Sequence, residues 1–488
     1  MVKFTKIPMR CLIIFGTNVK FCRAAYVYVS YEGMYRAALN QEVIVMKKRR
    51  ILATIMSAAM LATTLVGCGS DNNSNSSNSG SNGSSGSAND GGGSGSVEEL
   101  TWMFWDDLNA TEDLISLGYK ETIERFNNDF KGKYHVTPIT TNLEEYYNKL
   151  NALVAAGETP DVFIVSPGPQ LTDYVEPGVA APLDEYLNKD GWKDTFTSDA
   201  VFTQQTYDGK IYAVPLNTAA ACCFYNTEMF EKAGAKVPTN WDEMMEACEK
   251  LKAAKYTPVT ISAGTAWCLS MVAGYLCDAE GVDLPKLADG SASWEDGKLE
   301  SACNKLLDLS KYFQRTAAGD TNDVATANFY NEEAAILIQG SWVIGQINGS
   351  NPDFESKCGV FQFPGVDKII AKSDSLCMSS KTKNPEAAAT LIKYFTDDTA
   401  QKYTAEKGGK IPVTKVQYDA SVAPKQLGYV MDVFSNAKGT FGFYNESMPT
   451  TETGAHFDDT MVSVFLGDMK PAEAAKDMEE FYKANCRK

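Results

Sequence analysis

Histidine, the side chain that most often serves as a general acid or base, is scarce in this chain. Of 488 residues only two are histidines, His135 and His456, which argues against histidine-based triads and histidine-rich metal sites. The chain has no G-x-x-x-x-G-K-[ST], H-E-x-x-H or G-x-S-x-G sequence. We therefore predict no catalytic residue, no metal site and no cofactor. A secreted hydrolase with paired carboxylates stays open as an alternative, because residues 68–488 hold 60 Asp and Glu.

The cysteines do not form a recognisable metal or disulfide pattern. Nine follow Cys68, an odd number that cannot be fully paired within one chain, and none lie in a C-x-x-C sequence. Several lie in apolar stretches, where cysteine acts as a small hydrophobic residue. We expect them to be mostly buried. The nine are Cys222, Cys223, Cys248, Cys268, Cys277, Cys303, Cys358, Cys377 and Cys486.

A segment with the composition of an export signal precedes Cys68. Residues 46–50 are Met-Lys-Lys-Arg-Arg, and Ile51 to Val66 is an apolar run of 16 residues, short for a membrane span of about 20. Leu65-Val66-Gly67-Cys68 resembles the lipobox of bacterial lipoproteins, in which the cysteine becomes the lipidated first residue. The resemblance implies removal of the signal peptide, residues 46–67, and an acyl anchor on Cys68 at the extracellular face of the bacterial cytoplasmic membrane. A buried cysteine at a helix end is the alternative.

The residues on either side of this segment are expected to lie outside the folded body. Residues 1–45 hold too little apolar material for a stable core, so we expect upstream or mis-started sequence, with a small N-terminal module as the alternative. Residues 68–97 comprise Cys68 and a linker rich in Gly, Ser and Asn, which is too polar to fold. Residues 68–488 carry a net charge of −25, since ten Lys/Arg and two Asp/Glu precede them in a chain of charge −17. This charge argues against a nucleic-acid partner.

From Glu98 the pattern alternates between strands and helices, which predicts an α/β fold with a mostly parallel sheet. The remaining length of about 390 residues exceeds one typical core, so we expect two lobes. Local signals include an Asp208-Gly209 turn, Asn226 as a helix cap with Gly234 as the helix end, and Thr239 or Asn240 as a cap. The predicted elements are strands at Leu100–Trp105, Val136–Thr140 and Asp161–Val165, and helices at Leu114–Phe130 and Leu143–Ala156.

Several segments together resemble family 1 extracellular solute-binding proteins, the sugar-type receptors of ABC importers. The most specific is Asp208 to Glu243, which contains DGKIYAVP, then FYNTEMFEKAG and VPTNWDE. The resemblance spans about Glu98 to Lys483. The other segments that carry it, in chain order, are 155–162, 334–342, 363–365, 384–388 and 409–413.

The resemblance implies a two-lobed, type II-like periplasmic-binding-protein fold with a hinge and a ligand cleft between the lobes. It places the N-terminal lobe at 98–217 and 375–412, and the C-terminal lobe at 218–374 and 413–488. The implied function is a receptor that binds a small carbohydrate and delivers it to ABC permease subunits. A non-sugar solute is an alternative, and a structural or adhesive lipoprotein is a third class, which would lack a ligand cleft.

Aromatic side chains stack on the flat faces of sugars, and carboxylates and amides bind their hydroxyl groups. We therefore look for such residues at strand ends and loops of the implied cleft. For each of them, packing in the core, hinge or surface is the structural alternative. At Pro167-Gly168-Pro169 the chain lacks the aromatic or acidic residues that the family often has there. The predicted ligand-binding residues are Trp342, Trp105, Asp106, Trp267, Asn217, Ser166, Asp374, Tyr444 and His456.

Overall fold

The computed structural model describes residues 97–105, 107–111 and 113–486, together with four short strands near the N-terminus. The chain divides into two units, Met1–Gly91 and Gly92–Lys488. In the first unit β1 (Thr5–Pro8) pairs antiparallel with β4 (Tyr26–Val29), and β2 (Ile14–Phe15) pairs with β3 (Asn18–Val19). The signal peptide, Cys68 and most of the linker, as predicted from the sequence, lie outside the described residues.

The second unit contains two sheets, each with its own hydrophobic core. The first sheet has the strand order β10-β16-β7-β5-β6. Strands β5, β6 and β7 are parallel, whereas β16 runs antiparallel to both of its neighbours, β10 and β7. The strands are β5 (Glu98–Phe104), β6 (Tyr134–Thr140), β7 (Val162–Val165), β10 (Ala213–Pro215) and β16 (Ser375–Met378).

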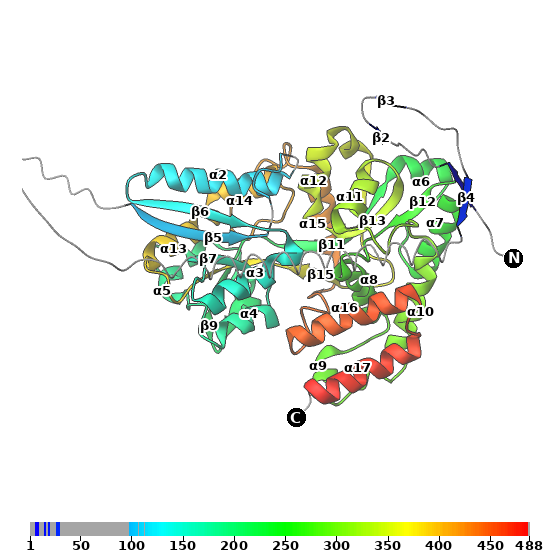
Figure 1. Cartoon of the computed structure of the whole chain (residues 1–488). Coiled ribbons are helices and arrows are strands. Elements are labelled where there is room, and N and C mark those ends of the chain that lie inside the picture. The colour runs from blue at the N-terminus through cyan, green and yellow to red at the C-terminus, as the bar shows by residue number, and fades with distance from the viewer. Residues whose placement is uncertain are drawn as a thin grey trace, which may run out of the picture. The chain divides into compact units, whose positions relative to one another are not determined.

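Helices from two distant parts of the chain pack on this first sheet and complete the N-terminal lobe. In Figure 1 the late helix α14 lies beside the early helix α2, and both α13 and α14 contact α2. The helices are α2 (Leu114–Asp129), α3 (Leu143–Ala156), α4 (Pro169–Val175), α5 (Asp184–Leu187), α13 (Pro385–Phe395) and α14 (Asp398–Glu406). Short additions are η1 (Lys193–Thr195), η2 (Asp199–Gln205), β8 (Thr206–Tyr207) and β9 (Lys210–Ile211).

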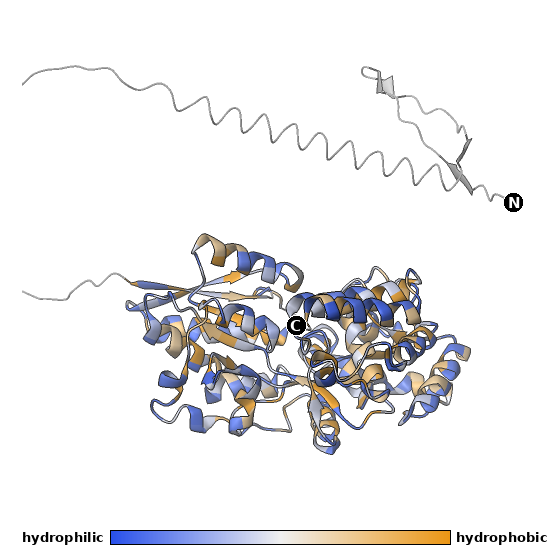
Figure 2. Cartoon of the chain, turned by 90° about the horizontal axis from the view of Figure 1, so that it is seen from below, coloured by the Kyte–Doolittle hydropathy of each residue, from blue (hydrophilic) through white to orange (hydrophobic). Residues whose placement is uncertain are grey.

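The second sheet has the order β12-β13-β11-β15-β17, with β14 also paired to β11. Strand β11 (Ala219–Asn226) is antiparallel to its neighbours, and the pairs β12–β13 and β15–β17 are parallel. Figure 2 colours much of the strands of both sheets as hydrophobic, in keeping with their place in the cores. The other strands are β12 (Thr257–Thr260), β13 (Ala334–Gly340), β14 (Cys358–Phe361), β15 (Ile369–Lys372) and β17 (Thr440–Phe441).

The helices around the second sheet form the C-terminal lobe. Helix α8 contains ten buried residues and packs against both α10 and α16. The helices are α6 (Thr227–Ala233), α7 (Trp241–Ala253), α8 (Ala266–Ala279), α9 (Leu284–Ala288), α10 (Lys298–Ser310), α11 (Asn322–Tyr330), α12 (Val343–Ser350), η3 (Pro352–Lys357), α15 (Lys425–Asn436), α16 (Thr451–Leu466) and α17 (Pro471–Asn485).

The local signals read from the sequence are confirmed. Asn226 caps α6 by accepting from the Met229 N–H, and α6 ends at Gly234. Asn240, rather than Thr239, caps α7, while Thr239 donates to the Glu243 carboxylate. Asp208 and Gly209 both have positive φ, 47° and 75°, the geometry of a two-residue type I′ hairpin turn between β8 and β9.

The chain crosses between the two lobes three times, and hydrogen bonds tie the crossings together. The first crossing links β10 to β11, and there the Leu216 N–H donates to the Asp374 carbonyl oxygen at 3.0 Å. The second crossing links β15 to β16 through Ser373 and Asp374. At the third, Ile411 pairs with Thr218. The buried Gln401 side chain donates to the Leu216 carbonyl and accepts from the Val413 N–H, so it fastens the first crossing to the third.

Candidate functional site

A pocket of about 200 Å³ lies between the two lobes. The N-terminal lobe contributes the segment Pro167–Pro169 and Gln204. The C-terminal lobe contributes Lys372, at the end of β15, and a loop between β17 and α16 that we call the Glu446 loop, residues 442–447. Because both lobes line it, the shape of this pocket depends on how closely they approach.

A network of partly buried charged side chains lies at the pocket, and two of its members, Lys372 and Glu446, line it. The Lys372 Nζ lies 2.9 Å from a Glu446 oxygen, 3.2 Å from an Asp374 oxygen and 3.3 Å from the Ser166 hydroxyl. The three charged side chains are only 14–20% exposed. Burial alone would lower the pKa of Lys372, but the carboxylates of Asp374 and Glu446 outweigh it and raise this pKa. Lys372 therefore stays protonated and cannot serve as a base for Ser166.

Tyr147 of the N-terminal lobe fixes the position of Ser166. Ser166 follows β7 directly, its backbone N–H donates to the Tyr147 hydroxyl at 3.0 Å, and its own hydroxyl donates to Asp374 at 3.3 Å. Trp105 packs against Tyr146 and Tyr147, with ring centroids 5.1 and 6.3 Å away. Burial raises the pKa of Tyr147, so its hydroxyl stays a neutral hydrogen-bonding group. Trp105 thus supports the wall through Tyr147 and is itself buried.

Three aromatic rings of the C-terminal lobe lie together beside the charged wall. The ring centroids of Trp267 and Trp342 are 5.7 Å apart, and both lie about 6 Å from Phe443. Trp267 lies in the first turn of α8 and Trp342 follows β13, so two strand-to-helix junctions bring these indoles together. Lys372 Nζ lies 5.2 Å from the centre of the Phe443 ring, which joins the aromatic group to the charged network. Both Trp267 and Trp342 are partly exposed.

The buried carboxyl group of Asp458 anchors the Glu446 loop through Asn445. Asn445 accepts from the Glu446 N–H and donates to Asp458 on α16 at 3.0 Å. Burial, with a smaller contribution from Glu446, raises the pKa of Asp458 to about 7.

Four of the predicted residues lie next to residues that line this pocket and do not line it themselves. Ser166 and Asp374 contact Lys372, and the rings of Trp267 and Trp342 lie against Phe443. Trp105 lies behind them. Asp106 and Cys68 are outside the described residues. Lys372, Phe443 and Glu446 were not predicted. The only signal for them in the sequence is that they lie close along the chain to predicted residues, Lys372 to Asp374, and Phe443 and Glu446 to Tyr444.

Three other predicted residues lie away from the pocket. Asn217 is buried at the first crossing and donates to the Tyr119 hydroxyl at 3.2 Å, so it holds the hinge. The Tyr444 ring is buried in the C-terminal lobe, and its hydroxyl donates to the Val282 carbonyl. His456 stacks on Phe481, with 4.0 Å between ring centroids, and its Nε2 lies 2.6 Å from an Asp477 oxygen.

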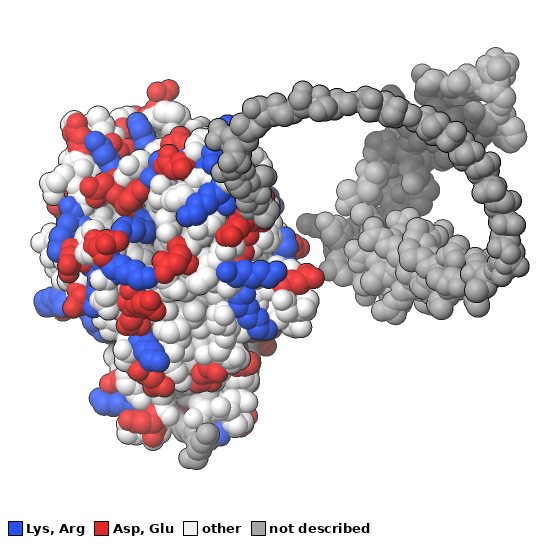
Figure 3. All heavy atoms as spheres, turned by 90° about the vertical axis from the view of Figure 1, so that its left-hand side faces the viewer, with Lys and Arg blue, Asp and Glu red and all other residues white. Residues whose placement is uncertain are grey.

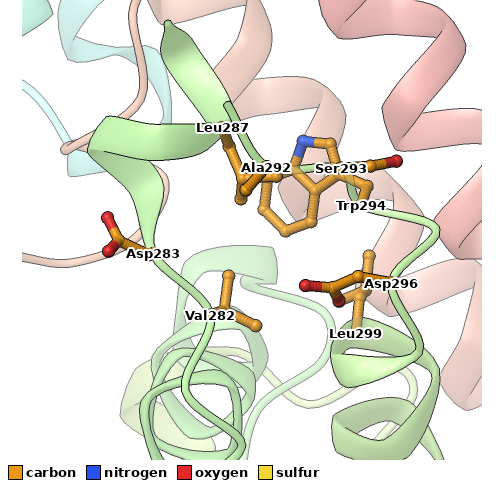
Figure 4. A pocket seen from close by; sticks show the side chains of 8 residues that line it. All are labelled: Val282, Asp283, Leu287, Ala292, Ser293, Trp294, Asp296 and Leu299. Carbon is orange, nitrogen blue, oxygen red and sulfur yellow. The ribbon is translucent and has the colours of Figure 1, made fainter. Parts of the chain in front are cut away.

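A second pocket lies within the C-terminal lobe, around Trp294 (Figure 4). Its volume is about 10 Å³, which is room for roughly one water molecule. Figure 4 shows its walls, which include Val282, Asp283 and Leu299. This pocket is too small for a solute, so the pocket between the lobes remains the candidate site.

Other kinds of site receive no support from the described part of the chain. It contains no group of three or more His, Cys, Asp or Glu side chains that could hold a metal ion. None of its helices is both long enough and apolar enough to cross a membrane. On the face of the N-terminal lobe shown in Figure 3, acidic and basic side chains are interspersed, without the continuous basic stripe that nucleic acid requires.

A family model described as bacterial extracellular solute-binding protein matches residues 121–427. The chain is 29% identical over 342 residues to the multiple sugar-binding protein of Streptococcus mutans, covering 63% of this chain and 77% of that protein.

Solved structures show the same fold. One comes from work on xylan utilization by the thermophilic bacterium Caldanaerobius polysaccharolyticus. It superposes with a TM-score of 0.73 at 25% identity and covers 78% of this chain and 99% of that one. A chitin oligosaccharide binding protein superposes equally well at 24% identity, covering 80% and 99% of the two chains. The second likeness concerns the fold alone.

Proposed function

Because this chain belongs to the bacterial extracellular solute-binding proteins, we propose that it is a receptor that binds a small carbohydrate and delivers it to an ABC-type importer. The family and its relatives are binding proteins rather than enzymes. The sequence contains no P-loop, so the energy for import comes from ATPase subunits on other chains. The relative in Streptococcus mutans, whose name states that it binds sugars, supports carbohydrate as the ligand class.

The observation that carries the proposal is the combination of surfaces at the interlobe pocket. Phe443 lines the pocket and Trp267 and Trp342 pack against it, and we propose that these rings provide apolar faces for the C–H groups of a sugar ring. Asp374 and Glu446 provide oxygens that accept from sugar hydroxyl groups, while Ser166 both donates and accepts. A small number of polar groups at fixed positions beside aromatic walls is typical of small-molecule sites.

Ligand capture is expected to proceed by closure of the lobes around the solute. The three crossings form a hinge, and the solute favours the closed arrangement because only there do both lobes contact it. We propose lobe boundaries at 217/218, 374/375 and 412/413. The composition of the two sheets supports this division, since residues 375–378 join the first sheet and residues 219–226 the second.

A thermal-shift screen against monosaccharides, disaccharides and longer oligosaccharides tests the carbohydrate assignment. A sugar at 100 times its Kd should raise the free energy of unfolding by about 2.7 kcal/mol. Incubation should release no cleavage product. Shifts with peptides or polyamines, and with no sugar, would refute the assignment.

Trp342→Ala should weaken the binding of any sugar that this screen finds, by at least tenfold in Kd. Trp241→Ala is the matched control, since Trp241 is also a partly exposed tryptophan of the C-terminal lobe. Trp241 is the first residue of α7, and its ring lies against Lys305 and not at the pocket. The control should lose stability and keep its affinity. Equal affinity in both variants would remove Trp342 from the site.

We further propose that Cys68 carries the lipid anchor that holds the receptor at the extracellular face of the cytoplasmic membrane, near its permease. The lipobox-like sequence and the polar linker that follows it support this. In cells grown with labelled palmitate, Cys68→Ala should lose the label and release the protein into the medium. Cys486→Ala, the control, should stay labelled and membrane-bound. Persistent labelling of Cys68→Ala would contradict the anchor.

A further inference from the structure

The segment Pro167–Pro169 forms a close contact between the backbones of the two lobes. Gly168 precedes α4 with φ of +77°, a conformation that L side chains rarely adopt. A Cβ atom built on Gly168 would overlap the carbonyl oxygen of Glu446 in the other lobe. The flanking residues Pro167 and Pro169 restrict the backbone on both sides. This edge of the pocket therefore has no room for even one methyl group.

Two further contacts join the lobes along the same edge. Thr451, at the start of α16, donates to the Asp173 carboxylate on α4 at 3.0 Å. Lys372 donates to Ser166 at 3.3 Å, immediately before the segment. The contacts thus run from Ser166 to Asp173, on one side of the pocket.

The closed edge limits the space that a ligand can occupy. The pocket volume of about 200 Å³ is below the roughly 300–1,000 Å³ of pockets that hold drug-sized ligands. A longer saccharide chain extending past this edge would have to separate Gly168 from Glu446 and Asp173 from Thr451. It would lose the contacts that favour closure.

We propose that the segment Pro167–Pro169 ends the ligand site, so that the receptor takes saccharides of one or two rings and excludes longer chains. Gly168 is then a specificity-determining residue, because its missing side chain allows the lobes to meet there. This inference rests on the proposed carbohydrate function. It also explains why the segment has neither the aromatic nor the acidic residues expected from the family: it contacts the other lobe rather than the sugar.

The first experiment measures the Kd of the wild-type protein for saccharides of one to six rings in several series, such as xylose to xylohexaose and glucose to maltohexaose. The tightest binding should occur at one or two rings, with at least a tenfold weaker Kd at four rings or more. Affinity that keeps rising up to four or six rings would overturn the length limit. Absence of binding by every saccharide would overturn the proposed function and the length limit together.

The second experiment tests the contact without any ligand. Asp173→Cys combined with Thr451→Cys should form an interlobe disulfide under mild oxidation, because the two side chains touch. Adding Gly168→Ala should slow this cross-linking at least tenfold. Gly178→Ala is the matched control: Gly178 has φ of +72° and lies in the same lobe, but nothing lies within 4 Å of its added Cβ. Equal cross-linking rates in the two backgrounds would overturn the role of Gly168.

Discussion

Asp458 is a carboxyl group that the protein buries without an opposite charge. One of its oxygens accepts from Asn445, and the Ser270 hydroxyl also lies against the carboxyl group, but burial outweighs both contacts. Burial raises the pKa of Asp458 from 3.8 to about 7. The folded protein therefore holds a proton on this residue, between about pH 4 and 7, that the unfolded chain has already released.

This proton makes the free energy of unfolding fall as pH rises through that window. Asp458→Asn keeps the shape and the hydrogen-bond acceptor but removes the titration. From pH 5 to pH 8 the variant should gain about 2–3 kcal/mol relative to wild type. Urea unfolding at the two pH values measures this difference. An unchanged difference between the proteins would show that Asp458 titrates normally.

The cysteines of the folded unit are all free thiols in the described structure, and all but Cys486 are buried. Burial raises the pKa of several, including Cys248, Cys303 and Cys358, each to about 12. Neutral, inaccessible thiols react slowly. In the native protein we expect a thiol reagent to label Cys486 first and the other eight only after unfolding. Mass spectrometry of the labelled peptides distinguishes these nine cysteines from Cys11, Cys22 and Cys68. Fast labelling of any of the eight in the native protein would contradict this.

At the scale of single elements, the end of β13 determines where Trp342 lies. A Cβ on Gly340 would overlap the six-membered ring of Trp342. Gly340→Ala should therefore displace the indole, lower stability by about 1–3 kcal/mol and weaken sugar binding by at least tenfold. Gly428→Ala makes the same chemical change in the exposed interior of α15, where nothing lies within 4 Å, and should stabilise the protein by up to about 1 kcal/mol. Titrations followed by tryptophan fluorescence compare the two, and unaltered affinity in Gly340→Ala would argue against this role.

Elements with a strong local pattern could be predicted from the sequence. The helix predicted at Leu143–Ala156 has those same bounds as α3, and Leu114–Phe130 differs from α2 by one residue. The caps at Asn226 and Asn240 are local hydrogen bonds, so the residues beside them are enough to predict them.

The wall of the pocket could not be predicted in the same way. Lys372 contacts both Ser166 and Glu446 only because β15 and the Glu446 loop come to the same interlobe edge as β7, from distant parts of the chain. The spacing of residues along the chain does not predict a contact between such distant segments. Conversely, Tyr444 lies close to Glu446 in sequence but its ring turns into the core, because the C-terminal lobe supplies the Val282 carbonyl as its partner.

At the scale of the whole molecule, Gln401 connects the crossings of the hinge. Its amide donates to the carbonyls of Leu216 and Phe395 and accepts from the Val413 N–H. Gln401→Met leaves these buried backbone groups without partners and should cost about 2–5 kcal/mol. Gln417→Met, at an exposed position of the same region, should change stability by less than about 0.5 kcal/mol. Chemical denaturation measures both, and a similar small effect at the two positions would contradict the role of Gln401.

The position of β16 within the first sheet has a consequence for the order of folding. This strand lies between β10 and β7 but is made long after both, since β11 to β15 come first in the chain. At about 5–20 residues per second, synthesis takes on the order of ten seconds to advance from Pro215 to Ser375. Until then β10 and β7 have no strand between them, and the N-terminal lobe cannot complete its sheet. One lobe of this extracellular protein therefore stays incomplete for that time during synthesis.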